Sequence, residues 1–178
     1  MRRGLTAAVL ALALAPVASA HAADYTLRAK GSTNGPGEVT AVGGFKPTVD
    51  AGTEAAIRVF GQPTSRKKAK TSCQLGWKKI GLRILFANFG GGDSCKLGKS
   101  QTVSAFGEKW HTANGLKVGS SVATLRKRYP KAEQTGNTYR LVGAKQVYGN
   151  GLRYSVLAAK TDGRKVTSFR LFAGAAGE

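Results

Sequence analysis

The sequence has few of the residues from which catalytic and metal sites are built. It contains two cysteines, two histidines and nine acidic residues in 178. No cluster of these residues has metal-ligand spacing, and no serine lies in the context of a nucleophile elbow. Glu108 and His111 could pair, but they fall in an expected connector. Gly90-Gly91-Gly92 predicts a turn, since the Lys-Ser/Thr of a phosphate-binding loop does not follow. We therefore predict a protein that is not an enzyme, with no cofactor and no metal.

Beyond its first residues the sequence has no apolar run long enough to span a membrane. Arg2 and Arg3 precede the apolar run Leu5–Val17, and small residues follow up to Ala22. This is the pattern of a secretory signal peptide. A membrane anchor would need about 20 apolar residues, more than this run provides. We expect residues 1–22 to be a signal peptide and the rest to be secreted or extracytoplasmic, in the periplasm or outside the cell, without a transmembrane segment.

Negative charge is scarce, because nine Asp and Glu stand against 28 Lys and Arg, a formal net charge of +19. Removing Arg2 and Arg3 would leave 19 − 2 = +17. Between Glu54 and Asp93 no acid occurs. The densest basic run there consists of Arg66, Lys67, Lys68 and Lys70. Such a field attracts acidic proteins or anionic envelope polymers, although solubility alone would also account for it. An exported protein seldom meets nucleic acid, so we expect no specific nucleic-acid partner.

Cysteine usage predicts one cross-link. Cys73 and Cys95 are the two cysteines of the chain, and an even pair in an exported protein is typical of a disulfide. Free thiols or metal ligands are the alternative, but one nearby histidine could not complete a metal site with them. We expect a structural disulfide.

Two stretches of the chain resemble each other at an offset of 69 to 70 residues. TEAAIRVF, ending before Gly61, and VATLRKRY, ending before Pro130, both place apolar residues at helical spacing. GLRILFANF from Gly81 and GLRYSVLAA from Gly151 both follow as strand-like runs. Each helix, near 51–60 or 120–129, is followed by further strand candidates.

We therefore predict an α+β fold of two tandem repeats, each a short helix packed on an antiparallel sheet of about three strands. The predicted segments are 1–22 as signal peptide, 23–108 as the first repeat with an N-terminal segment, and 109–178 as the second repeat. The helices should bury Phe60 and Tyr129. The strand residues expected to face the helices are Leu82, Ile84, Phe86, Leu152, Tyr154 and Val156. Strand alternation then directs the intervening residues to an open face: Arg83, Leu85, Arg153, Ser155 and Leu157.

The order of helix, Gly-x-Pro, basic loop, aromatic strand and hydrophobic strand resembles the outer-membrane assembly lipoproteins of the BamE/SmpA type. Ala56, Phe60, Gly61 and Pro63 stand at the helix end of that family, and Trp77 stands where its aromatic strand begins. Two such units in tandem resemble the architecture of beta-lactamase inhibitory protein, whose open sheet face grips a target enzyme. The lipid-attachment cysteine is absent and no contact motif matches, so the resemblance implies no target.

Together these patterns predict a secreted binding module, inhibitor-like in its use of an open sheet face to bind another protein. The alternative is a binder of anionic cell-envelope polymer through the basic surface. The residues expected to contact the partner are Arg83, Arg153 and Trp77. The residues expected to steer the encounter are Arg66, Lys67, Lys68 and Lys70.

Overall fold

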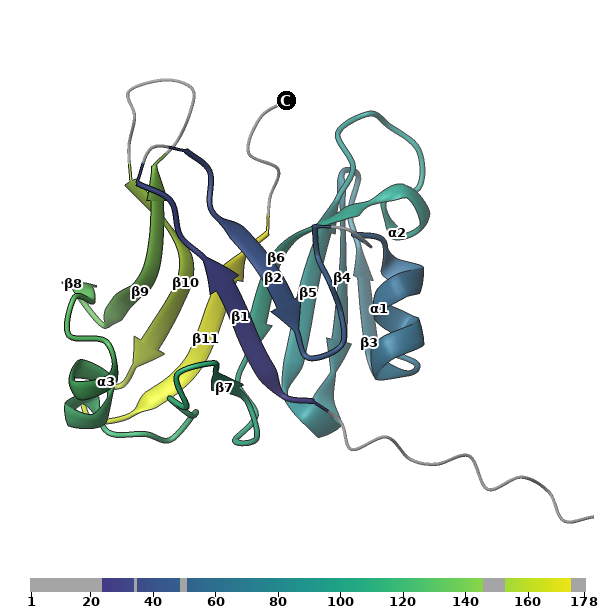
Figure 1. Cartoon of the computed structure of the whole chain (residues 1–178). Helices are drawn as coiled ribbons and strands as arrows, with labels where there is room; N and C mark the ends of the chain where they lie inside the picture. The colour runs from purple at the N-terminus through teal and green to yellow at the C-terminus, as the bar shows by residue number, and fades with distance from the viewer. Residues whose placement is uncertain (1–23, 34, 49–50, 146–152, 174–178) are drawn as a thin grey trace, which may run out of the picture.

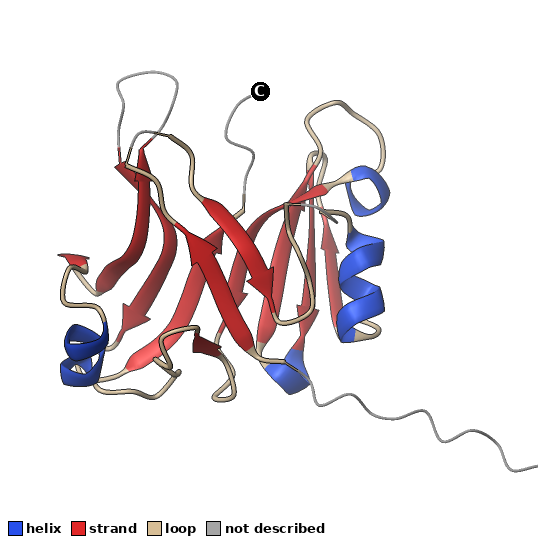
Figure 2. Cartoon of the chain, viewed as in Figure 1, coloured by secondary structure: helices blue, strands red, loops and turns tan. Residues whose placement is uncertain are grey.

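A computed structural model describes residues 24–33, 35–48, 51–145 and 153–173. Strands predominate and the helices are short (Figure 2). The predicted signal peptide lies outside the described residues. Among those that are described, no helix is long and apolar enough to cross a membrane.

One antiparallel sheet of eight strands forms the body of the molecule (Figure 1). Its strands follow the spatial order β3 (Ser65–Lys68), β4 (Ser72–Trp77), β5 (Leu82–Ala87), β6 (Lys99–Ala105), β11 (Val166–Phe172), β10 (Arg153–Thr161), β9 (Thr138–Lys145) and β8 (Glu133–Thr135). The strand predicted from Gly81 is present as β5, and the later hairpin strands are present too. The strand predicted from Gly151 is described from Arg153 onwards, so Gly151 and the predicted inward-facing Leu152 lie outside the described residues. Apolar residues alternate along β5, where Leu82, Ile84 and Phe86 are buried and Arg83 is exposed, as the sequence predicts.

A second, three-stranded sheet crosses one face of the first (Figure 1). It consists of β1 (Thr26–Lys30), β2 (Glu38–Val42) and β7 (His111–Thr112). β1 pairs antiparallel with β2 and parallel with β7. This sheet covers the core, and its residues Leu27, Val39 and Val42 are fully buried there.

The helices are α1 (Thr53–Phe60), α2 (Ser94–Leu97) and α3 (Val122–Arg128), with a 3-10 turn, η1 (Lys78–Ile80). The two longer ones stand where the sequence predicts them. α1 ends at Gly61, whose φ of 76° suits glycine. α3 begins at Ser121, whose side chain accepts a hydrogen bond from the Thr124 backbone N–H at 3.1 Å.

The prediction of two tandem helix-plus-sheet repeats is wrong as a fold class, since the molecule is mainly one large sheet. β6 and β11 pair with each other, through Val103 with Leu171 and Ala105 with Phe169. All four of these side chains are buried. Two separate sheets would have left these strands as unpaired apolar edges, which sheet proteins avoid. The covering sheet of β1, β2 and β7 is a further element that the sequence analysis missed.

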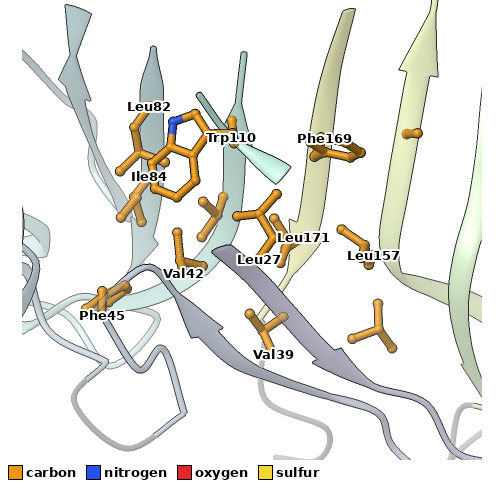
Figure 3. Close-up of a cluster of buried hydrophobic side chains, with 14 of the residues drawn as sticks. Leu27, Val39, Val42, Phe45, Leu82, Ile84, Trp110, Leu157, Phe169 and Leu171 are labelled. Atoms are coloured by element: carbon orange, nitrogen blue, oxygen red, sulfur yellow. The ribbon is translucent and has the colours of Figure 1, made fainter. Parts of the chain in front are cut away.

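The core lies between the two sheets (Figure 3). Residues from both ends of the chain meet there: Leu27, Val39, Val42, Phe45, Leu82, Ile84, Trp110, Leu157, Phe169 and Leu171. Phe60 of α1 lies at its margin and makes edge-to-face ring contacts with Phe45, Trp77 and Trp110 at 6.1, 5.4 and 6.3 Å. Phe60 and Tyr129 are only partly buried, so each helix covers less core than predicted.

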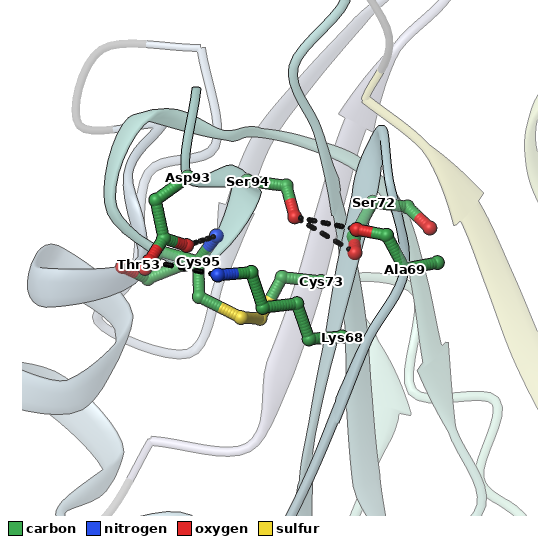
Figure 4. The surroundings of a disulfide bond; sticks show 8 residues. All are labelled: Thr53, Lys68, Ala69, Ser72, Cys73, Asp93, Ser94 and Cys95. Atoms are coloured by element: carbon green, nitrogen blue, oxygen red, sulfur yellow. Dashed lines mark hydrogen bonds and ion pairs between the residues drawn. A yellow bond between two sulfur atoms is a disulfide. The ribbon is translucent and has the colours of Figure 1, made fainter. Parts of the chain in front are cut away.

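Cys73 and Cys95 form the predicted disulfide, with Cα atoms 5.0 Å apart (Figure 4). The bond joins β4 to the start of α2. Asp93 caps α2 by accepting the Cys95 backbone N–H at 2.8 Å and pairs with the Lys68 ammonium at 3.0 Å. The Ser94 hydroxyl donates to the carbonyls of Ala69 and Ser72. Gly91 and Gly92 have positive φ, as expected for the predicted turn.

Candidate functional site

All the covering elements lie against the same face of the eight-stranded sheet. Phe60 of α1 contacts Trp77, and Arg126 of α3 lies over the ring of Tyr139 with its Cζ 5.6 Å from the centroid. Trp77 and Tyr139 both point to the core side. The opposite face, here called the open face, has no described element packed on it.

One row of side chains crosses the open face from edge to edge. In an antiparallel sheet, residues directly opposite each other on neighbouring strands point to the same face. The pairing places in this row Ser65, Gly76, Arg83, Ser104, Arg170, Ala158, Arg140 and Glu133. Three of these eight residues are arginines and one is acidic, so the row is basic.

Arg83 occupies the open face as predicted and is exposed. Its Cζ lies 5.8 Å from the ring centroid of Phe106, which is 42% exposed. Arginine above an aromatic ring forms a favourable cation–π contact that also restrains the guanidinium. In the part of the chain that the structure describes, Arg83 forms no ion pair. Its guanidinium is therefore restrained by the ring of Phe106, and its charge is available to a binding partner.

Arg170 and Phe172 extend the site onto β11. Arg170 is exposed and, among the described residues, has no ion-pair partner, while Phe172 is 44% exposed. Arg140 differs, because it pairs with Glu133 of β8. Arg83 and Arg170 are thus the two guanidinium groups of the row that remain open to a partner.

The remaining predicted site residues divide into three groups. Trp77 is wrong as a contact residue: it is 3% exposed, and its indole Nε1 donates to the Gly61 carbonyl at 2.8 Å. It is a core residue because strand alternation turns it towards α1. Arg153 opens β10, but its side chain lies outside what the structure describes. Leu157 is wrong as an open-face residue, since bulges on either side of it turn its side chain into the core.

The basic run is a strand rather than the predicted loop. Arg66, Lys67 and Lys68 belong to β3, the edge strand, and all are exposed, as is Lys70 in the following turn. By register Lys67 shares the open face with Gln74, whereas Arg66 and Lys68 lie on the other side. The hydrogen bond from Lys68 lowers the pKa of Asp93, with help from the Cys95 backbone N–H. Charged side chains also protect an edge from pairing with other chains.

Phe106, Arg170 and Phe172 are site residues that the sequence did not lead us to predict. The signal was present in KVTSFRLF, where Phe169 and Leu171 alternate with Arg170 and Phe172. What was missing was the partner of that strand. Only its pairing with β6 places Arg170 beside Ser104 and, one strand further, Arg83.

The side chains at this face are of the kinds that bind a partner. The row offers guanidinium groups and hydroxyls, and the exposed rings of Phe106 and Phe172 lie beside it. Such groups bind carboxylates and apolar side chains. Among the described residues, no three His, Cys, Asp or Glu side chains come close enough to hold a metal ion. His111 lies on β7, where its Nε2 is 3.2 Å from the Thr26 hydroxyl, so it joins two strands of the covering sheet.

Comparison with known proteins gives only distant likenesses. No protein-family model matches the chain, and no curated protein sequence does so. One matching solved structure is an extracellular protein containing an SCP domain from Bacillus anthracis str. Ames, with 10% identity and a TM-score of 0.41, over 67% of this chain and 42% of that one. Another is a cysteine-rich secretory protein from Staphylococcus aureus subsp. aureus Mu50, with 15% identity and a TM-score of 0.44, over 81% of this chain and 50% of that one.

This chain therefore spans half or less of the length of these two structures. With TM-scores below 0.5, they carry no argument about its function or location. The resemblance to BamE/SmpA-type lipoproteins and to beta-lactamase inhibitory protein is wrong, because the chain forms mainly one eight-stranded sheet covered by a three-stranded sheet, and not two tandem helix-plus-sheet units. The open face is therefore the candidate functional site.

Proposed function

We propose that this protein is an exported, non-catalytic module that binds another protein through the open face of its eight-stranded sheet. The observation that carries the proposal is the row across that face, in which Arg83 and Arg170 are exposed next to Phe106 and Phe172. Aromatic residues, phenylalanine included, and arginine are enriched in protein interfaces relative to the rest of the surface. The signal-peptide pattern of residues 1–22 supports an extracytoplasmic partner.

The test is capture from secreted and envelope material by the protein lacking residues 1–22. A captured protein is then purified, and its affinity is measured for wild type and for the double variant Arg83→Ala, Arg170→Ala. We expect at least about a hundredfold loss, since two interface arginines at a hot spot together cost several kcal/mol. Arg58→Ala is the matched control, because Arg58 is an exposed arginine on α1, away from the open face. Equal affinities of wild type and the double variant would refute the proposal.

The second candidate is a binder of anionic envelope polymer. The observation in its favour is β3, where three consecutive basic residues are exposed at the sheet edge. Here Arg66, Lys67 and Lys70 would carry the affinity, and their triple substitution by alanine would abolish binding of a soluble polyanion such as polyphosphate. In the protein-binding proposal the same substitutions slow association and leave the lifetime of the complex unchanged.

A further inference from the structure

A hollow lies on the open face beside Arg170. Its volume is about 300 Å³, at the lower end of the range for ligand pockets. It is lined by Thr138, Tyr154, Ser155, Ala158, Arg170 and Phe172. Phe172 supplies an aromatic wall, and its ring makes an edge-to-face contact with Tyr154, with ring centroids 5.8 Å apart. The Tyr154 hydroxyl accepts a hydrogen bond from the Gly37 backbone N–H at 3.1 Å, which fixes that ring at the end of the hollow.

The hollow exists because a small residue stands between two arginines of the row. Ala158 is paired with Arg170 on one side and with Arg140 on the other. Neighbouring strands are about 4.8 Å apart, so the backbones of the two arginines are roughly 10 Å apart. Between them lies only the methyl side chain of Ala158. Ser104 takes the same place between Arg83 and Arg170. Of these two small residues beside Arg170, Ala158 lines the hollow, together with Tyr154 and Phe172.

Its surroundings are apolar below and basic at the rim. Ala158 is 5% exposed and forms the floor, while the exposed Arg170 guanidinium stands at the edge. Arg140, on the far side, is already paired with Glu133. An apolar group can fill the hollow, and a carboxylate next to that group can reach Arg170, where arginine binds it bidentately.

We propose that this hollow is an anchor site for an apolar or aromatic side chain of the partner protein, flanked by a carboxylate that pairs with Arg170. The inference rests on the proposed function and specifies its partner as an acidic protein surface with an apolar anchor. Charge complementarity favours this occupant, given 28 basic against nine acidic residues in the chain. A polymer of phosphate groups would satisfy the arginines but would leave the aromatic walls empty.

The experiment uses two blocked pentapeptides that differ in one side chain, Glu-Glu-Phe-Glu-Glu and Glu-Glu-Ala-Glu-Glu, with polyphosphate as a third probe. Each is titrated into the isotope-labelled protein and followed by NMR. We expect the Phe peptide to bind about tenfold more tightly than the Ala peptide, the range of one well-packed anchor. The amide signals of Ser155, Ala158 and Phe172 should shift most.

Two variants locate the preference. Ala158→Leu fills the hollow and should reduce the affinity for the Phe peptide to that for the Ala peptide. Gln74→Leu places the same side chain on the same face, outside the hollow and away from the row of arginines, and should keep the preference. If Ala158→Leu does not fold, Phe172→Ala removes a wall of the hollow and must lower the preference instead.

The inference is overturned if the two peptides bind equally, if the preference survives in Ala158→Leu and Phe172→Ala, or if polyphosphate is the tightest probe. The double variant Arg83→Ala, Arg170→Ala separates this failure from that of the proposed function. If both peptides bind wild type equally and both lose affinity in the double variant, the open face remains the binding surface and only the anchor site is excluded. Peptides that bind the double variant as they bind wild type exclude the face itself.

Discussion

At the scale of the residue, Trp77 shows how an aromatic side chain in a basic region can belong to the core. Its ring packs against Phe60, and its Nε1–H donates a hydrogen bond to the Gly61 carbonyl. We predict that Trp77→Phe lowers the free energy of unfolding by about 1–3 kcal/mol, since it loses one hydrogen bond and part of a buried ring. Urea denaturation measures this change. Binding through the open face should be unaffected. If Trp77→Phe has wild-type stability but binds the partner more weakly, Trp77 contributes to the interface and not to the core.

Asp93 gives a prediction for pH. Its pKa is lowered from 3.8 by Lys68 and the Cys95 backbone N–H, so its ionised form stabilises the fold. The folded pKa lies below the unfolded one, hence the contribution is present above about pH 4 and is lost as pH falls through the folded pKa. Asp93→Asn keeps the cap acceptor but not the charge. We expect the stability difference between wild type and Asp93→Asn to shrink below about pH 4.

Chemical denaturation at a series of pH values measures this difference. Lys68→Ala is the matched variant, because it removes the partner and leaves the carboxylate at the cap. In that background the pH-dependent part of the Asp93→Asn effect should be smaller. A difference that stays constant from neutral pH to about pH 2 would mean that the ion pair contributes nothing to folding.

At the scale of the element, the disulfide connects β4 to α2 across a sequence separation of 22 residues. Closing a loop of this size stabilises by about 3 kcal/mol in the chain-entropy model. We predict that Cys73→Ala, Cys95→Ala loses about this amount in urea denaturation under oxidising conditions. Because the bond lies on the core side of β4, binding at the open face should persist. Equal denaturation midpoints for the variant and wild type would contradict a stabilising role.

How far the elements follow from the sequence depends on how local their causes are. The helices at Thr53–Phe60 and Val122–Arg128 and the inward face of β5 follow from spacing within a few residues. The pairing of β6 with β11 joins strands more than 60 residues apart in sequence (Ala105 with Phe169). No local sequence pattern predicts this pairing. The covering sheet is likewise made by long-range pairing.

The site was predictable to the same extent. Arg83 lies on the predicted face because alternation along one strand is enough to place it. Leu157 does not, because bulges in β10 shift the alternation. Arg170 enters the site through a strand partner that the sequence does not name. A binding row that crosses strands is therefore visible only once the order of the strands is known.

At the scale of the whole molecule, the fold separates stability from recognition. The covering sheet, α1, α2 and α3 all contribute to one face of the large sheet, where the core is sealed by residues such as Leu27 and Trp110. The other face is left to surface side chains. Substitutions of its exposed arginines should therefore alter binding with little effect on folding, which makes the open face suitable for clean mutational tests.

The net charge of +19 makes salt the test that separates the two functional candidates. Binding of a polyanion through several phosphate contacts falls by about 10³-fold or more between about 50 and 200 mM salt, as for nucleic acids. A packed arginine–aromatic interface is screened less, since its contacts are partly desolvated. We predict that affinity for the captured protein weakens by less than about tenfold over that range, chiefly through slower association. Surface plasmon resonance of wild type and the Arg66→Ala, Lys67→Ala, Lys70→Ala variant measures both rates. A dissociation rate that rises steeply with salt in wild type would instead favour the polymer-binding candidate.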